Sequence, residues 1–174
     1  ADWSLAAPVT ALEGTFTDPT YPFGSTQNGQ REVHLGVEFQ QAHGASVMAA
    51  ASGTVIVAGD DSQTVYGLYQ NFYGNLVVIE HEIAEWEAPV YTLYAHLSDV
   101  LVSTGDRVAA GTTVGAVGAS GAATGSHLHF EVRVGNNDPS SAVNPLLFLA
   151  PPAGADEDAG QIVGSIVNAV SETD

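Results

Sequence analysis

The chain has 174 residues, which suits one domain with a hydrophobic core and short ends, and its 45% apolar content excludes a disordered composition. Its 20 acidic residues against three basic ones give a formal charge of −17, which argues against nucleic acid as a partner because phosphate would be repelled. Cysteine is absent, so any metal must be held by His, Asp or Glu. No apolar run approaches the roughly 20 residues that a membrane-spanning helix needs.

Residues 1–30 are rich in Pro, Gly, Thr and Ser, and they predict an irregular N-terminal lead-in with room for one strand. The opening residues Ala1 to Ser4 are compatible with a terminus left by removal of a signal peptide. We therefore expect a secreted protein of the extracellular space or the cell envelope.

Residues 31–150 alternate short β-rich runs with glycine turns. This spacing predicts one mainly β domain, built as a small antiparallel β-sandwich or barrel-like fold. In chain order, strands are expected within residues 45–58 around a turn at 52–53, and over residues 75–81, 90–96, 100–103, 107–109, 112–117 and 127–134.

Residues 151–174 differ in composition from the domain before them. They open with two prolines and continue into an acidic run at 155–158, and apolar residues then recur at helical spacing between 162 and 170. The segment predicts an acidic tail that forms a short amphipathic helix or begins a linker to a further domain.

His127 and His129 lie two apart on the clearest predicted strand. Side chains at i and i+2 point to the same face of a strand, so the two imidazoles share a face. They suit one metal site, or one metal ligand beside one acid–base group. An exposed polar strand face is the alternative that this pair alone leaves open.

His34 and Glu38 lie four apart in the segment His34-Leu35-Gly36-Val37-Glu38. On a straight strand they would be roughly 13 Å apart, at about 3.3 Å per residue, which is too far for one ion. Both could bind one ion only if the backbone bends between them, and Gly36 permits a bend. Without a bend, the pair would be a cap or a salt bridge.

The other histidines are weaker candidates. His96 ends a predicted strand and, taken alone, would be structural. His81-Glu82 begins like the helical zinc motif His-Glu-x-x-His, but position 85 is Glu and the segment follows a strand, so we reject that interpretation. His81 is predicted to be structural, and His43 is predicted to lie in a loop.

Three motifs in order then resemble the lysostaphin-like, or LytM-type, zinc endopeptidases over about residues 31–149. They are His-x-Gly-x-Glu at 34–38, Tyr-Ala-His-Leu at 94–97 and Thr-Gly-Ser-His-Leu-His-Phe-Glu-Val at 124–132. The resemblance implies a small antiparallel β fold with a groove over one sheet. It also implies hydrolysis of peptide bonds in bacterial cell-wall peptidoglycan.

The resemblance further implies roles for single residues. One zinc ion would be held by His34, His129 and Glu38, which occupies the place of the family's usual aspartate. His127 and His96 would be catalytic histidines that do not bind the metal. His127 would act as the base, and His96 would share proton transfer or stabilise the oxyanion.

Glu38 is one methylene longer than aspartate, and this departure separates two hypotheses. The first is a working zinc endopeptidase, which we favour because every other site residue is present. The second is a non-catalytic module that binds the cell wall or an envelope protein partner. Tyr21 and Phe23 closely precede the first motif and are predicted to line the substrate cleft, with packing of the lead-in as the alternative.

Overall fold

The structure is a computed structural model that describes residues 4–10, 17–83 and 87–150. The helix or linker predicted for residues 151–174 lies outside these ranges. Within them, regular structure is nearly all β, with two 3-10 helices, η1 (Pro139–Ser141) and η2 (Pro145–Leu147). None of the helices among these residues is long and apolar enough to cross a membrane.

The strands confirm the mainly β prediction. Their bounds are β1 Val37–Gln40, β2 Ser46–Met48, β3 Gly53–Asp60, β4 Asn75–His81, β5 Val90–Val100, β6 Arg107–Val108, β7 Thr113–Val117, β8 His127–Val134 and β9 Ala142–Val143. The strand predicted over residues 100–103 is wrong, because β5 runs on to Val100 and residues 101–103 lie outside any strand.

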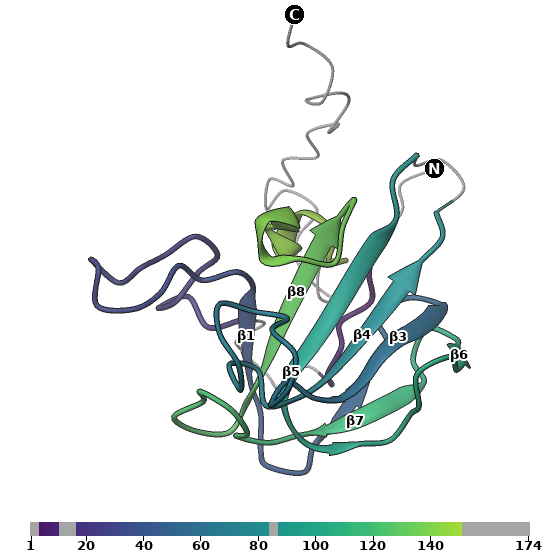
Figure 1. Cartoon of the computed structure of the whole chain (residues 1–174), viewed down its shortest axis with the longest axis horizontal. Coiled ribbons are helices and arrows are strands. Elements are labelled where there is room, and N and C mark those ends of the chain that lie inside the picture. Colours follow the sequence, from purple (N-terminus) through teal and green to yellow (C-terminus); the bar gives the residue numbers. More distant parts are fainter. Residues whose placement is uncertain (1–3, 11–16, 84–86, 151–174) are drawn as a thin grey trace, which may run out of the picture.

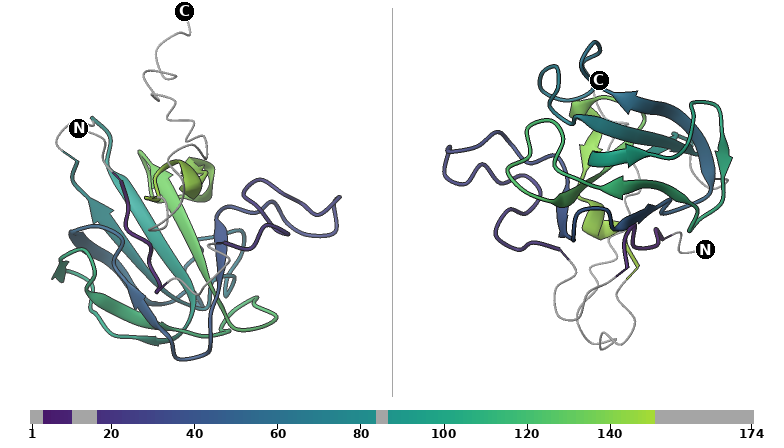
Figure 2. Two further views of the ribbon diagram at one scale, coloured as in Figure 1. Left: turned by 180° about the vertical axis from the view of Figure 1, so that it is seen from behind. Right: turned by 90° about the horizontal axis from the view of Figure 1, so that it is seen from below.

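The strand order is β1-β8-β5-β4-β3-β6, and the neighbouring strands pair antiparallel. Strand β7 pairs with β2 and with the end of β5. Figure 1 shows the long strands fanned side by side, with β7 crossing them at one end. The views in Figure 2 show that the sheet curls, as expected when one β-sheet supplies two layers of a small domain.

Strand β5 changes its pairing partner at His96. Residues 90–95 pair with β8, whereas Leu97 and the residues after it pair with β7. His96 has φ +60°, in the left-handed region that residues other than glycine rarely adopt. Such strain persists only where surrounding structure enforces it, and here the corner in the sheet does so.

The two faces of β8 have opposite chemistry. Leu128, Phe130 and Val132 are fully buried in the main hydrophobic core. The alternating residues His127, His129, Glu131 and Arg133 form a polar row on the other face, as the period of two dictates. One strand therefore supports the core and presents the chemistry-bearing side chains.

The N-terminal lead-in packs onto the domain. Leu5 and Val9 are buried in the main core. The Leu5 N–H donates to Phe148 O at 2.7 Å, and the Ala150 N–H donates to Leu5 O at 2.8 Å. Residues 17–34 then project from the sheet beside β1, as the purple segment of Figure 1 shows.

Candidate metal centre

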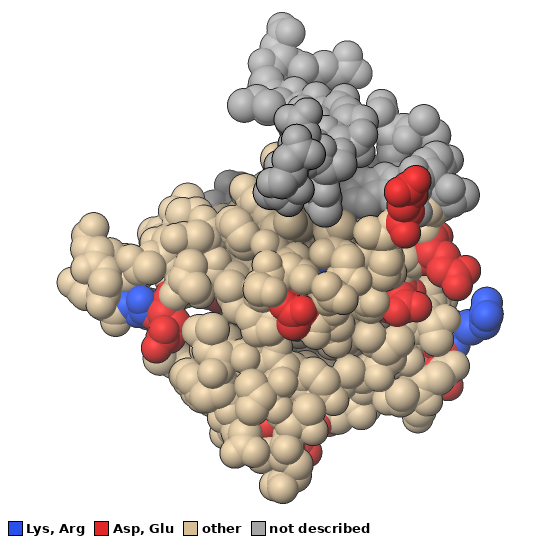
Figure 3. Space-filling view, turned by 45° about the horizontal axis from the view of Figure 1, so that its top comes forward, with Lys and Arg blue, Asp and Glu red and all other residues tan. Residues whose placement is uncertain are grey.

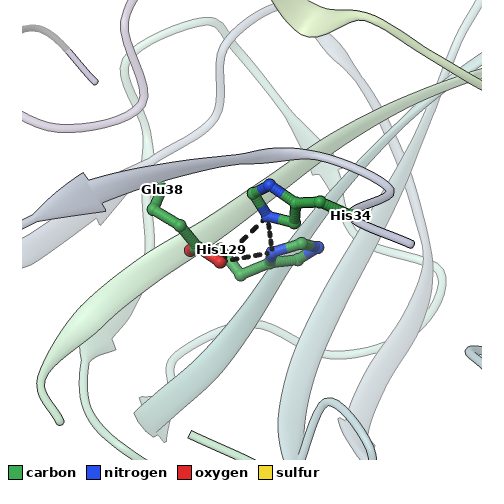
Figure 4. A group of neighbouring side chains, drawn as sticks. All are labelled: His34, Glu38 and His129. Atoms are coloured by element: carbon green, nitrogen blue, oxygen red, sulfur yellow. Dashed lines mark hydrogen bonds and ion pairs between the residues drawn. The ribbon is translucent and has the colours of Figure 1, made fainter. Parts of the chain in front are cut away.

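Three side chains predicted to bind metal converge at one point. His34 Nε2 lies 3.0 Å from Glu38 Oε1 and 3.3 Å from His129 Nδ1, and Glu38 Oε1 lies 3.1 Å from His129 Nδ1. All three residues are buried. Figure 4 shows them pointing toward one another, His34 from the segment before β1, Glu38 from β1 and His129 from β8.

A bend before β1 brings His34 and Glu38 together. Residue 36 is a bend, and β1 begins only at Val37, so the segment is not the straight strand that would separate the two side chains. A Cβ on Gly36 would lie 2.3 Å from Phe130 O, far inside van der Waals contact. Glycine is therefore needed at position 36 because the chain passes close to β8. The sequence had predicted only that Gly36 permits a bend.

The geometry fits a tetrahedral metal ion. Ligands about 2.0–2.1 Å from a zinc ion in tetrahedral geometry are separated by roughly 3.3–3.4 Å, and the triangle formed by His34, Glu38 and His129 is only slightly tighter. Glu38 Oε2 and His34 Nδ1 are buried without a hydrogen-bond partner among the described residues. A cation bound by His34 Nε2, Glu38 Oε1 and His129 Nδ1 would relieve the repulsion between these atoms when both imidazoles are neutral.

Glu131 sets the orientation and protonation of His129. Its Oε1 lies 2.9 Å from His129 Nε2, and because an ionised carboxylate can only accept, that nitrogen carries the proton. In the neutral ring, His129 Nδ1 then has a lone pair toward Glu38, where a metal ion would take the place of the second proton. A metal-binding imidazole commonly donates its other ring N–H to a carboxylate, which fixes the tautomer and raises the basicity of the ligand.

Arg133 and Tyr73 hold Glu131 in turn. Glu131 and Arg133 are 0% exposed, and Arg133 Nε donates to Glu131 Oε2 at 2.8 Å. The Tyr73 hydroxyl donates to Glu131 Oε1, and an Arg133 terminal nitrogen donates to the Tyr73 hydroxyl at 2.8 Å. Arg133 also donates to Asn137 Oδ1 and Tyr66 O, both at 3.0 Å. The buried arginine therefore has the partners that burial of a charge requires.

His127 and His96 lie beside the triangle, and each ring is anchored through Nδ1 on a backbone carbonyl. His127 Nδ1 lies 2.9 Å from Gly125 O and His96 Nδ1 lies 2.8 Å from Ser120 O, so each Nδ1 carries the proton. The two rings are 4.9 Å apart, and His127 Nε2 is 3.2 Å from Glu38 Oε2. Two polarised imidazoles therefore stand next to the metal-binding group.

The pKa values of Glu38 and His129 move in opposite directions because the two groups attract each other, whereas the pKa of His96 falls. Burial alone would raise the pKa of Glu38, but the charge of His129 and hydrogen bonds hold that pKa well below its usual range. Burial alone would lower the pKa of His129, yet the Glu38 charge and the hydrogen bond to Glu131 raise it to about 10. For His96, burial and repulsion by the neighbouring histidines lower the pKa to about 4, so it is neutral at pH 7.

A cavity of about 520 Å³ opens over the centre and includes all five predicted metal and catalytic residues in its lining. Tyr21 also lines it: its ring stacks on His34 with centroids 4.0 Å apart, and its hydroxyl donates to Glu32 O at 2.8 Å. Tyr69 and Phe72 line it as well, from the loop between β3 and β4. Phe23 is partly buried and is not part of the lining.

The two histidines set aside in the sequence lie away from the centre. His81 ends β4 and is buried, with ring nitrogens 2.9 Å from Ser52 O and 2.8 Å from Thr92 Oγ1, which fits its predicted structural role. Because it ends a strand, it is not part of a helical zinc motif. His43 is exposed in a turn, as predicted.

The residues that support the proposed ligand His129 through hydrogen bonds were not predicted from the sequence. Glu131 and Arg133 continue the same-face row of His127 and His129, so the period of two could have identified them. Tyr73 comes from a distant loop, and no local pattern links it to β8.

The chain matches the model of Peptidase family M23 over residues 32–145. It is 36% identical over 110 residues to peptidoglycan DD-endopeptidase ShyC of Vibrio cholerae, covering 63% of this chain and 24% of ShyC. The chain thus spans about a quarter of the length of that curated relative.

Solved structures show the same likeness. The catalytic domain of the antimicrobial peptidase lysostaphin from Staphylococcus simulans superposes with a TM-score of 0.58 at 31% identity, covering 73% of this chain and 85% of that domain. A zinc containing peptidase from Vibrio cholerae gives a TM-score of 0.55 at 29% identity, over 82% of this chain and 37% of that one. The fold, the ordered motifs and these matches together place the chain in Peptidase family M23.

Proposed function

We propose that the protein is a zinc-dependent endopeptidase that hydrolyses peptide bonds of bacterial peptidoglycan, in the extracellular space or cell envelope. The observation that carries the proposal is the triangle of His34, Glu38 and His129 beside two further histidines, each anchored through Nδ1 on a backbone carbonyl. The name of the ShyC relative, a peptidoglycan DD-endopeptidase, supports the substrate, and the zinc containing peptidase supports the metal.

His34 Nε2, Glu38 Oε1 and His129 Nδ1 would hold one ion. When bound, zinc supplies a Lewis acid that polarises a carbonyl and lowers the pKa of water to roughly 7. Glu38 fits this role despite its extra methylene, because its Oε1 already lies 3.0 Å and 3.1 Å from the two imidazole ligand atoms.

His127 is the base in this proposal. Its Nδ1–H is anchored on Gly125 O, so Nε2 is directed toward the centre, 3.2 Å from Glu38 Oε2, and in the neutral ring it can take a proton from the attacking water. As the new carbon–oxygen bond forms and the carbon–nitrogen bond breaks, that proton passes to the leaving amine. A neutral imidazole suits this exchange near neutral pH.

His96 is the second catalytic histidine. Its low pKa and its bond to Ser120 O leave Nε2 as an acceptor, and it becomes a donor only after taking a proton. His96 is therefore better suited to relaying the proton toward the leaving amine than to stabilising an oxyanion from the outset. The strained backbone at His96 fixes its ring at the corner of β5, beside His127.

The experiment is digestion of purified peptidoglycan by the zinc-loaded protein, with the products identified by mass spectrometry. We expect new peptide termini, loss of the reaction after treatment with a chelator, and recovery on adding zinc. Attachment of the protein to the wall without new termini, under zinc-loaded conditions, would instead support the non-catalytic module that binds the cell wall or an envelope partner.

A further inference from the structure

Arg31 is the basic residue of the cavity wall. The chain has three basic residues in all. Arg133 is fully buried and bound to Glu131, and Arg107 lies on β6, outside the cavity lining. Arg31 is exposed and lines the cavity. Figure 3 shows acidic side chains scattered over one face of the molecule and its conspicuous basic side chains at opposite edges.

The loop that carries Arg31 is held by its own hydrogen bonds. At its base the Gly24 N–H donates to His34 O at 2.8 Å, and the His34 N–H donates to Ser25 O at 2.9 Å. Inside the loop the Arg31 N–H donates to Thr26 O at 3.0 Å. The backbone of Arg31 is therefore fixed relative to His34, one of the proposed metal ligands.

The Arg31 side chain lies close to the proposed metal centre. Its guanidinium carbon is 5.0 Å from the centroid of the Tyr21 ring, and that ring stacks on the His34 ring at 4.0 Å with an interplanar angle of 6°. The guanidinium and the proposed metal ligand His34 therefore contact the same Tyr21 ring. An extended peptide advances about 3.3 Å per residue, so a substrate held at the centre would reach Arg31 within two or three residues.

The Arg31 guanidinium makes no ion pair with any carboxylate of the described residues. Guanidinium presents a planar fork of N–H donors that matches a carboxylate, and stacking on an aromatic ring leaves that fork available. A chain with a charge of −17 repels anionic substrates at long range. A cation in the cleft therefore has a marked effect on which anionic groups bind there.

We propose that Arg31 is a carboxylate-binding subsite of the cleft. The substrate class would then be a stem peptide that carries a free carboxylate within two or three residues of the scissile bond, rather than an uncharged cross-bridge. This inference rests on the proposed peptidase function, and it specifies which of the peptides of the wall the site takes.

The test compares two forms of the same cross-linked dimeric muropeptide: one with its carboxylates free, and one whose carboxylates have been converted to carboxamides with carbodiimide and ammonium. The zinc-loaded full chain should hydrolyse the free form with a kcat/KM about tenfold higher. Arg31→Gln should reduce kcat/KM about tenfold on the free form and far less on the amidated form. Arg31→Lys should recover part of the preference, because it keeps the charge without the planar fork.

Two further variants control for net charge. Arg107→Gln removes the same charge from an exposed arginine outside the cavity and should leave the preference unchanged. Glu32 lines the cavity next to Arg31 and is exposed, so Glu32→Gln should raise the rate on the free form by lowering repulsion. Because Arg31 is exposed, the preference should also shrink at about 1 M salt, where the screening length is about 3 Å.

Equal hydrolysis of both forms by the wild type, or an equal loss on both forms in Arg31→Gln, would overturn the subsite. Failure of the peptidase proposal has a different result, which is no hydrolysis of either form. In that case the affinities of the two dimers are measured by calorimetry for the zinc-loaded wild type and for Arg31→Gln. Tighter binding of the free form by the wild type, lost in Arg31→Gln, supports the subsite, and equal affinities overturn it.

Discussion

Glu131 is the residue on which the tautomer of His129 depends. It accepts from His129 Nε2 through one oxygen and from Arg133 Nε through the other. A glutamine at this position cannot reproduce both bonds, since one end of its amide is a donor. We predict that Glu131→Gln weakens zinc binding about 10- to 100-fold, measured by competition with a chelator of known affinity.

The same substitution leaves Arg133 buried without its carboxylate, which costs about 3–5 kcal/mol of unfolding free energy. A second variant separates this effect from metal binding. Glu131→Gln combined with Arg133→Met removes the unpaired charge, so it should recover much of the stability in denaturant unfolding while zinc binding stays weak. Zinc affinity in the double variant equal to that of the wild type would show that Glu131 acts on folding alone.

At the scale of secondary-structure elements, the site depends on how closely the segment before β1 approaches β8. A Cβ at Gly36 would lie 2.3 Å from Phe130 O and 3.0 Å from His129 Cε1. A backbone oxygen in a paired strand has little freedom to move, so Gly36→Ala should push the two strands apart. We predict a loss of about 1–3 kcal/mol in unfolding free energy, together with weaker zinc binding because His34 and Glu38 move relative to His129.

Gly125→Ala is the matched control for that substitution. A Cβ there meets nothing within 4 Å, and its φ is not in the left-handed region. Urea unfolding of the metal-free proteins and a zinc titration of each provide the comparison. Wild-type stability and zinc affinity in Gly36→Ala would contradict the close approach described here.

Local patterns were sufficient for much of this element structure. Glycine turns and β-rich runs predicted most strands, and the period of two predicted that His127 and His129 share a face. Local patterns could not predict the corner at His96, because it arises where β5 stops pairing with β8 and begins to pair with β7. For the same reason the strand predicted over residues 100–103 was misplaced: pairing with β7 extends β5 to Val100.

At the scale of the whole molecule, the net negative charge of the chain and the buried carboxylates of the metal centre are separate properties. The charge of −17 is a property of the whole sequence, and it excludes partners more readily than it identifies them. The centre draws on two buried carboxylates, Glu38 and Glu131, that net charge alone does not reveal. Convergence of residues 34–38 with residues 127–131 follows from the pairing of β1 with β8, a long-range contact that only the ordered motifs suggested in advance.

The most direct test of the account is zinc content and peptidoglycan turnover measured side by side in the wild type and in His127→Ala. Both proteins should hold one zinc ion per chain, whereas turnover should fall about 10²- to 10⁴-fold in the variant, because only its base is lost. His43→Ala, which alters an exposed histidine, should match the wild type in both measurements. Equal turnover in the wild type and His127→Ala, or a wild type that binds no zinc at neutral pH, would contradict the account.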